Sequence, residues 1–176
     1  MVMLILVVVS LLGVGGAQIA LMSERGARND RDQQMAWQAA EAALMDADFE
    51  MSYSTSDRIA TFDGKNLGVF VAGCGISGDL VGLCALNLTG KPAWLTVDYT
   101  DVSNNAPTTA FGTFTNRSFA HGGVGIQPAK APRYVMEMVS DPSSDPSDPT
   151  YLYRVTAMGF GPRADIQAVL QMIYRI

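Results

Sequence analysis

The first 22 residues contain no charged side chain, and this feature constrains the fold more than any other. The run from Met1 to Leu12 is apolar except for Ser10. A helix of about 20 apolar residues crosses the ~30 Å hydrocarbon core of a bilayer. A helix that is apolar on all sides is stable only in lipid or in a bundle of similar helices. The sequence therefore predicts a membrane-spanning helix over residues 1–22.

Two explanations of this segment compete, a retained anchor and a cleaved signal peptide. A signal peptide has a basic start, an apolar core of roughly 7 to 15 residues and a small-residue cleavage site. Here the first charges, Glu24 and Arg25, follow the apolar run, and no Pro interrupts the sequence up to Glu50. A retained anchor is favoured, and the same helix is expected to continue over residues 23–50.

The predicted continuation is amphipathic. Its first turns carry charges of both signs, such as Glu24 and Arg28 at i,i+4 spacing. An Ala-rich stretch follows, in which Trp37, Ala40 and Leu44 share one face. This face is predicted to pack against a globular domain formed by residues 51–176.

Gly13, Gly15 and Gly16 are unusual inside a helix, because each Gly costs up to ~1 kcal/mol relative to Ala. One interpretation is close helix packing in a membrane through small residues such as Gly13 and Ala17. The other is a segment that can unwind. The missing side chains fit both interpretations.

Charge and cysteine content exclude several classes of function. The net charge of -5 and the absence of a Lys/Arg-rich block argue against nucleic-acid binding. The only cysteines, Cys74 and Cys84, are predicted to form a disulfide in a domain outside the cytoplasm. Zinc binding is the alternative, but there is no second Cys pair and the single His121 lies far away in the sequence. No catalytic residue, metal site or cofactor is predicted.

Local patterns predict further elements in the middle of the chain. Residues 58–62 and 68–72 are expected to be strands joined by a turn at Asp63-Gly64. Residues 94–99 alternate in the manner of a strand, and residues 100–131 are expected to be a long surface excursion. Residues 141–149 are expected to be a solvated Asp- and Pro-rich link, with Ca²⁺ binding by its aspartates as the alternative.

The strongest strand patterns lie near the end of the chain, over residues 132–139, 151–157 and 166–176. Short links between them predict an antiparallel meander. In the last strand, Leu170 and Met172 belong to the face that is predicted to lie on the Ala-rich half of the helix. The expected fold class is α+β, with a long helix packed on a C-terminal antiparallel sheet.

The segment Gln38-Ala39-Ala40-Glu41-Ala42-Ala43-Leu44, directly downstream of a one-span apolar helix, resembles the N-terminal region of PilX-type minor pilins of type IV pili. Sequences near the other end of the chain are similar to the same family; they are Pro132-Arg133-Tyr134-Val135-Met136-Glu137, Tyr153-Arg154-Val155-Thr156-Ala157-Met158-Gly159 and Ala168-Val169-Leu170-Gln171. The resemblance spans both ends of the chain and leaves mainly the middle unmatched.

The resemblance implies a structural subunit that inserts its apolar helix into the inner membrane, with a periplasmic domain, and then into the core of a pilus. Val7, Leu11 and Val14 are expected to form the helix face that packs on other subunits. Other minor pilins are the implied partners, in an initiating complex at or near the pilus tip, with the major pilin and a large tip adhesin as further candidates.

The chain departs from most pilins in two respects. It shows neither a short basic leader ending in Gly nor a Glu near the start of the apolar helix. A subunit without that Glu would suit the tip, where no subunit lies ahead of it; a start upstream of Met1 is the other explanation.

Two alternative functions share features of this sequence. The K-type pseudopilin of a type II secretion system belongs to the same class, but it usually carries a large inserted domain for which 176 residues leave no room. A membrane-tethered periplasmic enzyme or binding module belongs to a different class, and no nucleophile motif supports it.

Overall fold

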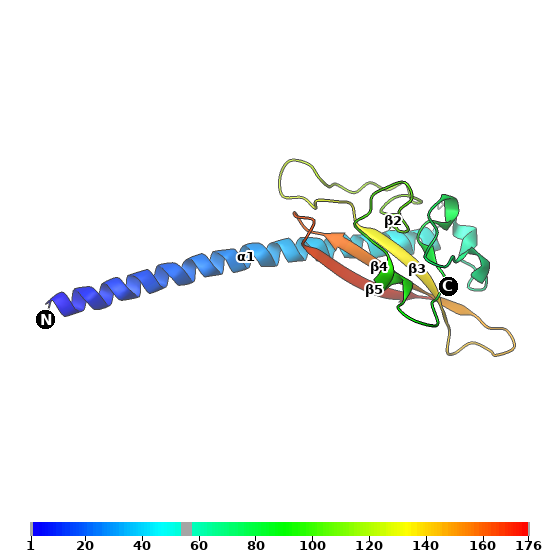
Figure 1. Cartoon of the computed structure of the whole chain (residues 1–176), viewed down its shortest axis with the longest axis horizontal. Coiled ribbons are helices and arrows are strands. Elements are labelled where there is room, and N and C mark those ends of the chain that lie inside the picture. The colour runs from blue at the N-terminus through cyan, green and yellow to red at the C-terminus, as the bar shows by residue number, and fades with distance from the viewer. Residues whose placement is uncertain (1, 54–57, 176) are drawn as a thin grey trace.

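A single helix, α1 (Val2–Ser52), accounts for 51 residues of the chain. The computed structural model describes residues 2–53 and 58–175. At about 1.5 Å per residue, α1 is roughly 75 Å long. Its first half projects away from the rest of the molecule, and its second half lies along a sheet (Figure 1). The predicted continuous helix is confirmed, and it ends at Ser52, two residues beyond the expected boundary.

The sheet is built on the predicted meander of β3 (Arg133–Ser140), β4 (Tyr151–Phe160) and β5 (Gln167–Tyr174). Both strand pairs, β3 with β4 and β4 with β5, are antiparallel. Two short strands, β1 (Leu83–Cys84) and β2 (Thr109–Ala110), pair with β3, and β1 does so in parallel. The α+β prediction is therefore confirmed, and the two short strands are additions to it.

Two glycines near the end of β4 allow α1 to lie directly on the sheet. A Cβ atom built on Gly159 would lie 2.1 Å from the Ala36 carbonyl oxygen and 2.3 Å from the Ala40 nitrogen. One built on Gly161 would lie 2.9 Å from the Asp32 carbonyl oxygen. Small residues on both elements are thus required where the backbones meet.

Farther along α1 the interface contains larger side chains. Ala43, Ala47 and Met51 are buried on the helix. They belong to one apolar core with side chains of the sheet and of the loops before it, namely Phe62, Phe70, Leu83, Tyr134, Met136, Met138, Tyr153, Val155 and Ala157. The helix and the sheet therefore diverge from a backbone contact near Ala36 to a filled core near Met51.

α1 and β5 run in the same direction. The Gln33 side chain donates to the carbonyl oxygen of Gln167 at 3.3 Å, at the start of β5. At the other end of the strand, the hydroxyl groups of Ser52 and Tyr174 are 2.8 Å apart. This shared direction fixes how the sheet edge is presented relative to the membrane segment.

The predicted hairpin over residues 58–72 is wrong. Two 3₁₀ helices, Ile59–Thr61 and Leu67–Val69, occupy these positions. The Asp63 side chain accepts hydrogen bonds from the backbone N–H groups of Lys65 and Asn66, so the turn is closed locally instead of joining two strands.

The strand-like alternation of residues 94–99 was also misleading. Residues Ala93–Thr96 form the short helix α2, with Pro92 at its N-cap. The backbone N–H of Ala93 donates to the buried carboxylate of Glu137 on β3. This tertiary contact favours a helical turn over an extended chain.

The long segment 100–131 is a surface excursion, as expected, and residues 121–126 are exposed. It also contains β2 and a tight turn in which the Asn116 N–H donates to the Gly112 carbonyl oxygen. The link between β3 and β4 is exposed for most of its length.

Candidate assembly surface on α1

The apolar half of α1 has no packing partner among the residues that the structure describes. Its most apolar 18-residue window has a mean hydropathy of 2.4, and none of that window is buried. Val7, Leu11 and Val14 are 58%, 69% and 60% exposed. By length and composition this segment can cross a membrane. An apolar surface of this size requires a lipid or protein environment outside the chain.

The three glycines of this half pack against no other described part of the chain. A Cβ atom added to Gly13, Gly15 or Gly16 would meet nothing within 4 Å, and α1 is helical throughout this region. Whether the segment unwinds in another environment stays a prediction. Close contact with other molecules would explain why Gly occupies these positions, and so would a capacity of the helix to unwind.

The second half of α1 carries two carboxylates that the sequence analysis did not single out. Asp46 and Glu50 lie one turn apart and are both fully buried. The Asp46 carboxylate accepts from the Gly112 N–H at 2.7 Å and from the Thr115 hydroxyl at 2.6 Å. It therefore holds the segment 100–131 against the helix. Asp46 and Glu50 follow the buried Ala43 and Ala47 by three residues each, and this shared helix face is the sequence signal that could have revealed their burial.

Glu50 forms a buried ion pair with Arg58 and accepts a hydrogen bond from the Tyr134 hydroxyl. The Arg58 guanidinium donates to the carbonyl oxygens of Asp79 and Val81 at 2.9 and 2.7 Å, and it lies 3.8 Å from the centre of the Phe114 ring. Burial raises the pKa of Glu50 above its usual value, although the Arg58 charge opposes this shift. Burial, together with the nearby Glu50 charge, raises the pKa of Tyr134.

These contacts make the ion pair a structural connection. Arg58 joins α1 to the loop before β1, and Tyr134 joins α1 to β3. Buried charges are tolerated where they are hydrogen-bonded, and here both Glu50 carboxylate oxygens and all three Arg58 guanidinium nitrogens bond to protein groups. These bonds fix α1 to the domain. Because Glu50 and Arg58 are bonded to each other and to neighbouring groups, neither is available as an acid or base for catalysis.

A disulfide between Cys74 and Cys84 is present, as predicted. Both cysteines are buried in a small core with Ala93, Tyr99 and Val135, on the side of the sheet opposite α1. Cys84 belongs to β1, so the bridge ties the loop around Cys74 to the sheet. The bridge thus stabilises the covering of the second sheet face.

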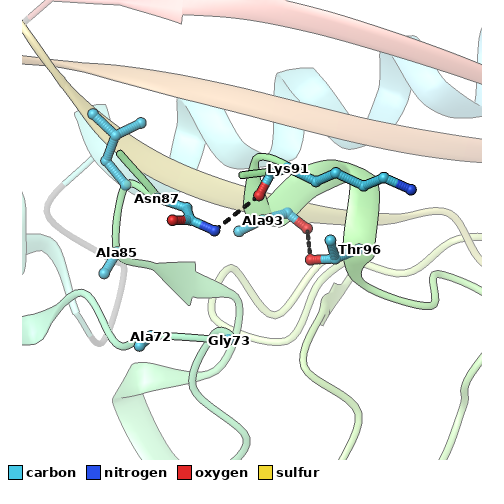
Figure 2. A pocket seen from close by; sticks show the side chains of 8 residues that line it. Ala72, Gly73, Ala85, Asn87, Lys91, Ala93 and Thr96 are labelled. Atoms are coloured by element: carbon cyan, nitrogen blue, oxygen red, sulfur yellow. Dashed lines mark hydrogen bonds between the residues drawn. The ribbon is translucent and has the colours of Figure 1, made fainter. Parts of the chain in front are cut away.

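A pocket of about 280 Å³ lies beside this covering layer (Figure 2). Two of its polar side chains bond within their own loop: the Asn87 amide donates to the Lys91 carbonyl oxygen and the Thr96 hydroxyl donates to the Ala93 carbonyl oxygen. The remaining labelled residues, Ala72, Gly73 and Ala85, offer no side-chain chemistry. The pocket does not bring an acid, a base and a nucleophile together.

Among residues 2–53 and 58–175, no group of three or more His, Cys, Asp or Glu side chains could hold a metal ion. The aspartates of the link 141–149 are used separately. Asp141 accepts from Ser143 and Arg175, Asp145 accepts from Ser147, and Asp148 pairs with Lys65. The bonds of Asp141 and Asp148 connect the link to Arg175 and to Lys65.

The residues predicted to join the helix and the sheet have different positions. Ala40 is fully buried, and Leu44 and Met172 pack against the main core. Leu170 is partly buried. Trp37 is 49% exposed, and its indole N–H donates to Glu41, so the prediction that it packs on the sheet is wrong. The closest backbone contact is next to it, at Ala36 and Ala40, and leaves no space for an indole.

Comparison with protein families gives two matches. Residues 1–44 match the PilX N-terminal family, and residues 80–176 match the type IV pilus assembly protein PilX C-terminal family. Searches of curated proteins and of solved structures give no match. The matched ranges include the exposed apolar half of α1, the start of its buried half and the whole meander. The chain therefore belongs to the PilX family of type IV pilus assembly proteins, the PilX-type minor pilins.

Proposed function

We propose that this minor pilin helps to form the complex that initiates assembly of a type IV pilus and that it stays at or near the pilus tip. The observation that carries the proposal is the exposed apolar half of α1 in a member of the PilX family. Such a helix fits both environments of a pilin, the inner membrane before assembly and the filament core afterwards.

The fold supports a packing role. The apolar half is exposed, whereas the second half is fixed to the domain by the Gly159 contact and by the Glu50–Arg58 pair. A subunit of this kind can transfer its apolar helix from lipid to other helices without changing its domain. The proposed partners are other minor pilins, with the major pilin and a tip adhesin as further candidates.

The three glycines of the apolar half concern the transfer of this helix from lipid to the filament. We propose that Gly13, Gly15 and Gly16 serve contacts or flexibility in the assembled state, because no contact within the described part of the chain requires them. Replacing Gly15 by Ala would raise helix stability by up to ~1 kcal/mol. A loss of pili with an unchanged domain would support a role in assembly.

Gene deletion with complementation in producing cells tests the main proposal. Loss of the chain is expected to reduce the number of pili at least tenfold, and labelled chain in complemented cells should lie at one end of each pilus. Label spread evenly along the filaments would overturn the tip position. A normal number of pili without the chain would overturn the role in initiation.

A further inference from the structure

The two edges of the sheet differ in how they are covered. On the outer edge of β3, β2 pairs with Arg133 and Tyr134, and β1 pairs with Met136 and Glu137. At the other edge, β5 pairs with β4 and with no other described strand (Figure 1). An unpaired strand edge offers a row of N–H and C=O groups to any strand that can reach it.

Hydrogen-bond geometry identifies the open groups. The Gly161 N–H donates to the Ile166 carbonyl oxygen at 2.8 Å, which fixes the phase of the β4–β5 ladder. Because alternate residues of an antiparallel strand face opposite neighbours, the N–H and C=O groups of Val169, Gln171 and Ile173 point away from β4. The bond from Gln33 to the Gln167 carbonyl oxygen agrees with this phase and occupies only the start of the edge.

β5 has none of the usual features that prevent edge pairing. Residues 167–174 include no Pro, Gly or charged side chain, and the register with β4 is continuous from Gln167 to Tyr174. Val169 and Ile173, on the face away from α1, are 45% and 57% exposed. A strand added here would bond to three residues and cover two apolar side chains.

We propose that the β5 edge receives a β-strand from a different protein, an extended segment of about five or more residues with apolar side chains at alternate positions. The backbone groups that require partners are ladder groups, which a strand satisfies and a helix does not. The alternating apolar side chains would lie beside Val169 and Ile173 and extend the exposed face of the sheet.

A second copy of this chain fits the edge poorly. Antiparallel pairing of two β5 strands relates the copies by a two-fold axis that reverses α1 as well, because α1 and β5 run in the same direction. The two apolar segments would then point in opposite directions and could not share one membrane. Parallel pairing of identical strands requires a one-residue offset, so it does not close into a symmetric dimer.

Photo-cross-linking of the full chain in producing cells tests this proposal. A photoreactive amino acid is placed in turn at positions 169, 171 and 173, and at 170 and 172 as matched controls whose side chains face α1. The first three are expected to give adducts with one contiguous segment of another protein, and the controls are expected to give at least tenfold less.

Substitution V169P separates ladder pairing from side-chain contact. It removes an N–H that faces away from β4, so the domain is expected to fold, whereas adducts from position 173 should fall at least tenfold; V169T should keep them. Adducts only with a second copy, adducts unchanged by V169P, or no adducts would each overturn the proposal.

Hydrogen exchange covers the case in which V169P does not fold. The amides of Val169, Gln171 and Ile173 should exchange at least tenfold more slowly in the assembled state than in the free chain. Equal rates in the two states would also overturn the proposal. None of these outcomes depends on the number or position of pili, so they are distinct from the test of the proposed function.

Discussion

The two halves of α1 have the same backbone structure and opposite surroundings. Residues 2–22 expose nearly all their side chains, including Val7 and Leu11. The second half buries Ala36, Ala40, Ala43 and Ala47 completely. The first half therefore depends on molecules outside the chain, and the second half determines how the domain is held together.

The chemistry of the two halves explains this division. The first half has mostly apolar side chains on all sides and no charged side chain, and the Ser10 hydroxyl bonds within the helix, to the Leu6 carbonyl oxygen. The second half has small residues at the sheet contact and two carboxylates with fixed partners, Asp46 and Glu50. Substitutions in one half should therefore leave the property served by the other half unchanged.

Removing a buried charge from the second half should have the largest effect. Glu50→Ala leaves the Arg58 guanidinium buried without its carboxylate, and breaking such a pair costs about 3–5 kcal/mol of folding free energy. Chemical unfolding of the full chain in detergent would measure this loss. Glu41→Ala, at an exposed position of the same helix, is the control and should change stability by less than about 1 kcal/mol.

A charge in the first half should act on the membrane and leave the domain intact. Val7→Lys places an ammonium group in the apolar segment, at a cost of up to about 3 kcal/mol for insertion. The fraction of chain in the membrane pellet should fall, whereas the unfolding midpoint of the domain should not move. A shifted midpoint would mean that the two halves are coupled.

Exchange of Gly for Ala compares the halves directly. Gly159→Ala forces the Ala36–Ala40 backbone of α1 away from β4 and should cost about 1–3 kcal/mol. Gly15→Ala meets no neighbour and should not destabilise the domain. Equal unfolding free energies for the two variants would contradict the close contact between helix and sheet.

The smallest expected effect concerns pH. Residues 2–22 contain no charged side chain, so titration of α1 arises in its later part. Burial raises the pKa of Glu50 above 4.5, which means that the folded chain holds this proton more tightly than the unfolded chain. The extra stability that comes from this tighter proton binding is fully present below pH 4.5 and is lost as pH rises through the folded pKa, where the carboxylate ionises beside Arg58. Glu50→Gln should flatten this part of the stability profile, and an unchanged slope would contradict the assignment.

Periodicity was sufficient to predict the elements that carry most of the architecture. The apolar run and the Ala-rich stretch predicted α1, and alternation over three segments predicted β3, β4 and β5. Each of these patterns extends over many residues, so local chemistry and burial agree along the whole element. The disulfide followed from there being only two cysteines, Cys74 and Cys84.

Short sequence patterns predicted the wrong secondary structure where contacts with side chains determine the backbone conformation. The Asp63 side chain accepts a hydrogen bond from Lys65 within its own turn, and the expected hairpin over residues 58–72 does not form. Glu137 accepts a hydrogen bond from the Ala93 N–H at the start of α2, and the expected strand over residues 94–99 does not form. The buried role of Glu50 was also missed, because a carboxylate on an Ala-rich helix is normally solvent-facing. Its burial depends on Arg58 and Tyr134, and Tyr134 is distant in the sequence.

The central claim is that the apolar half of α1 is held by partners from outside the chain. Cysteines introduced singly at Val7 and Leu11 test it most directly, since Cys74 and Cys84 are already paired. Cross-linking in producing cells is expected to join the full chain to other pilin subunits through both positions. A chain that stays monomeric at both positions, in cells that assemble pili, would contradict the claim.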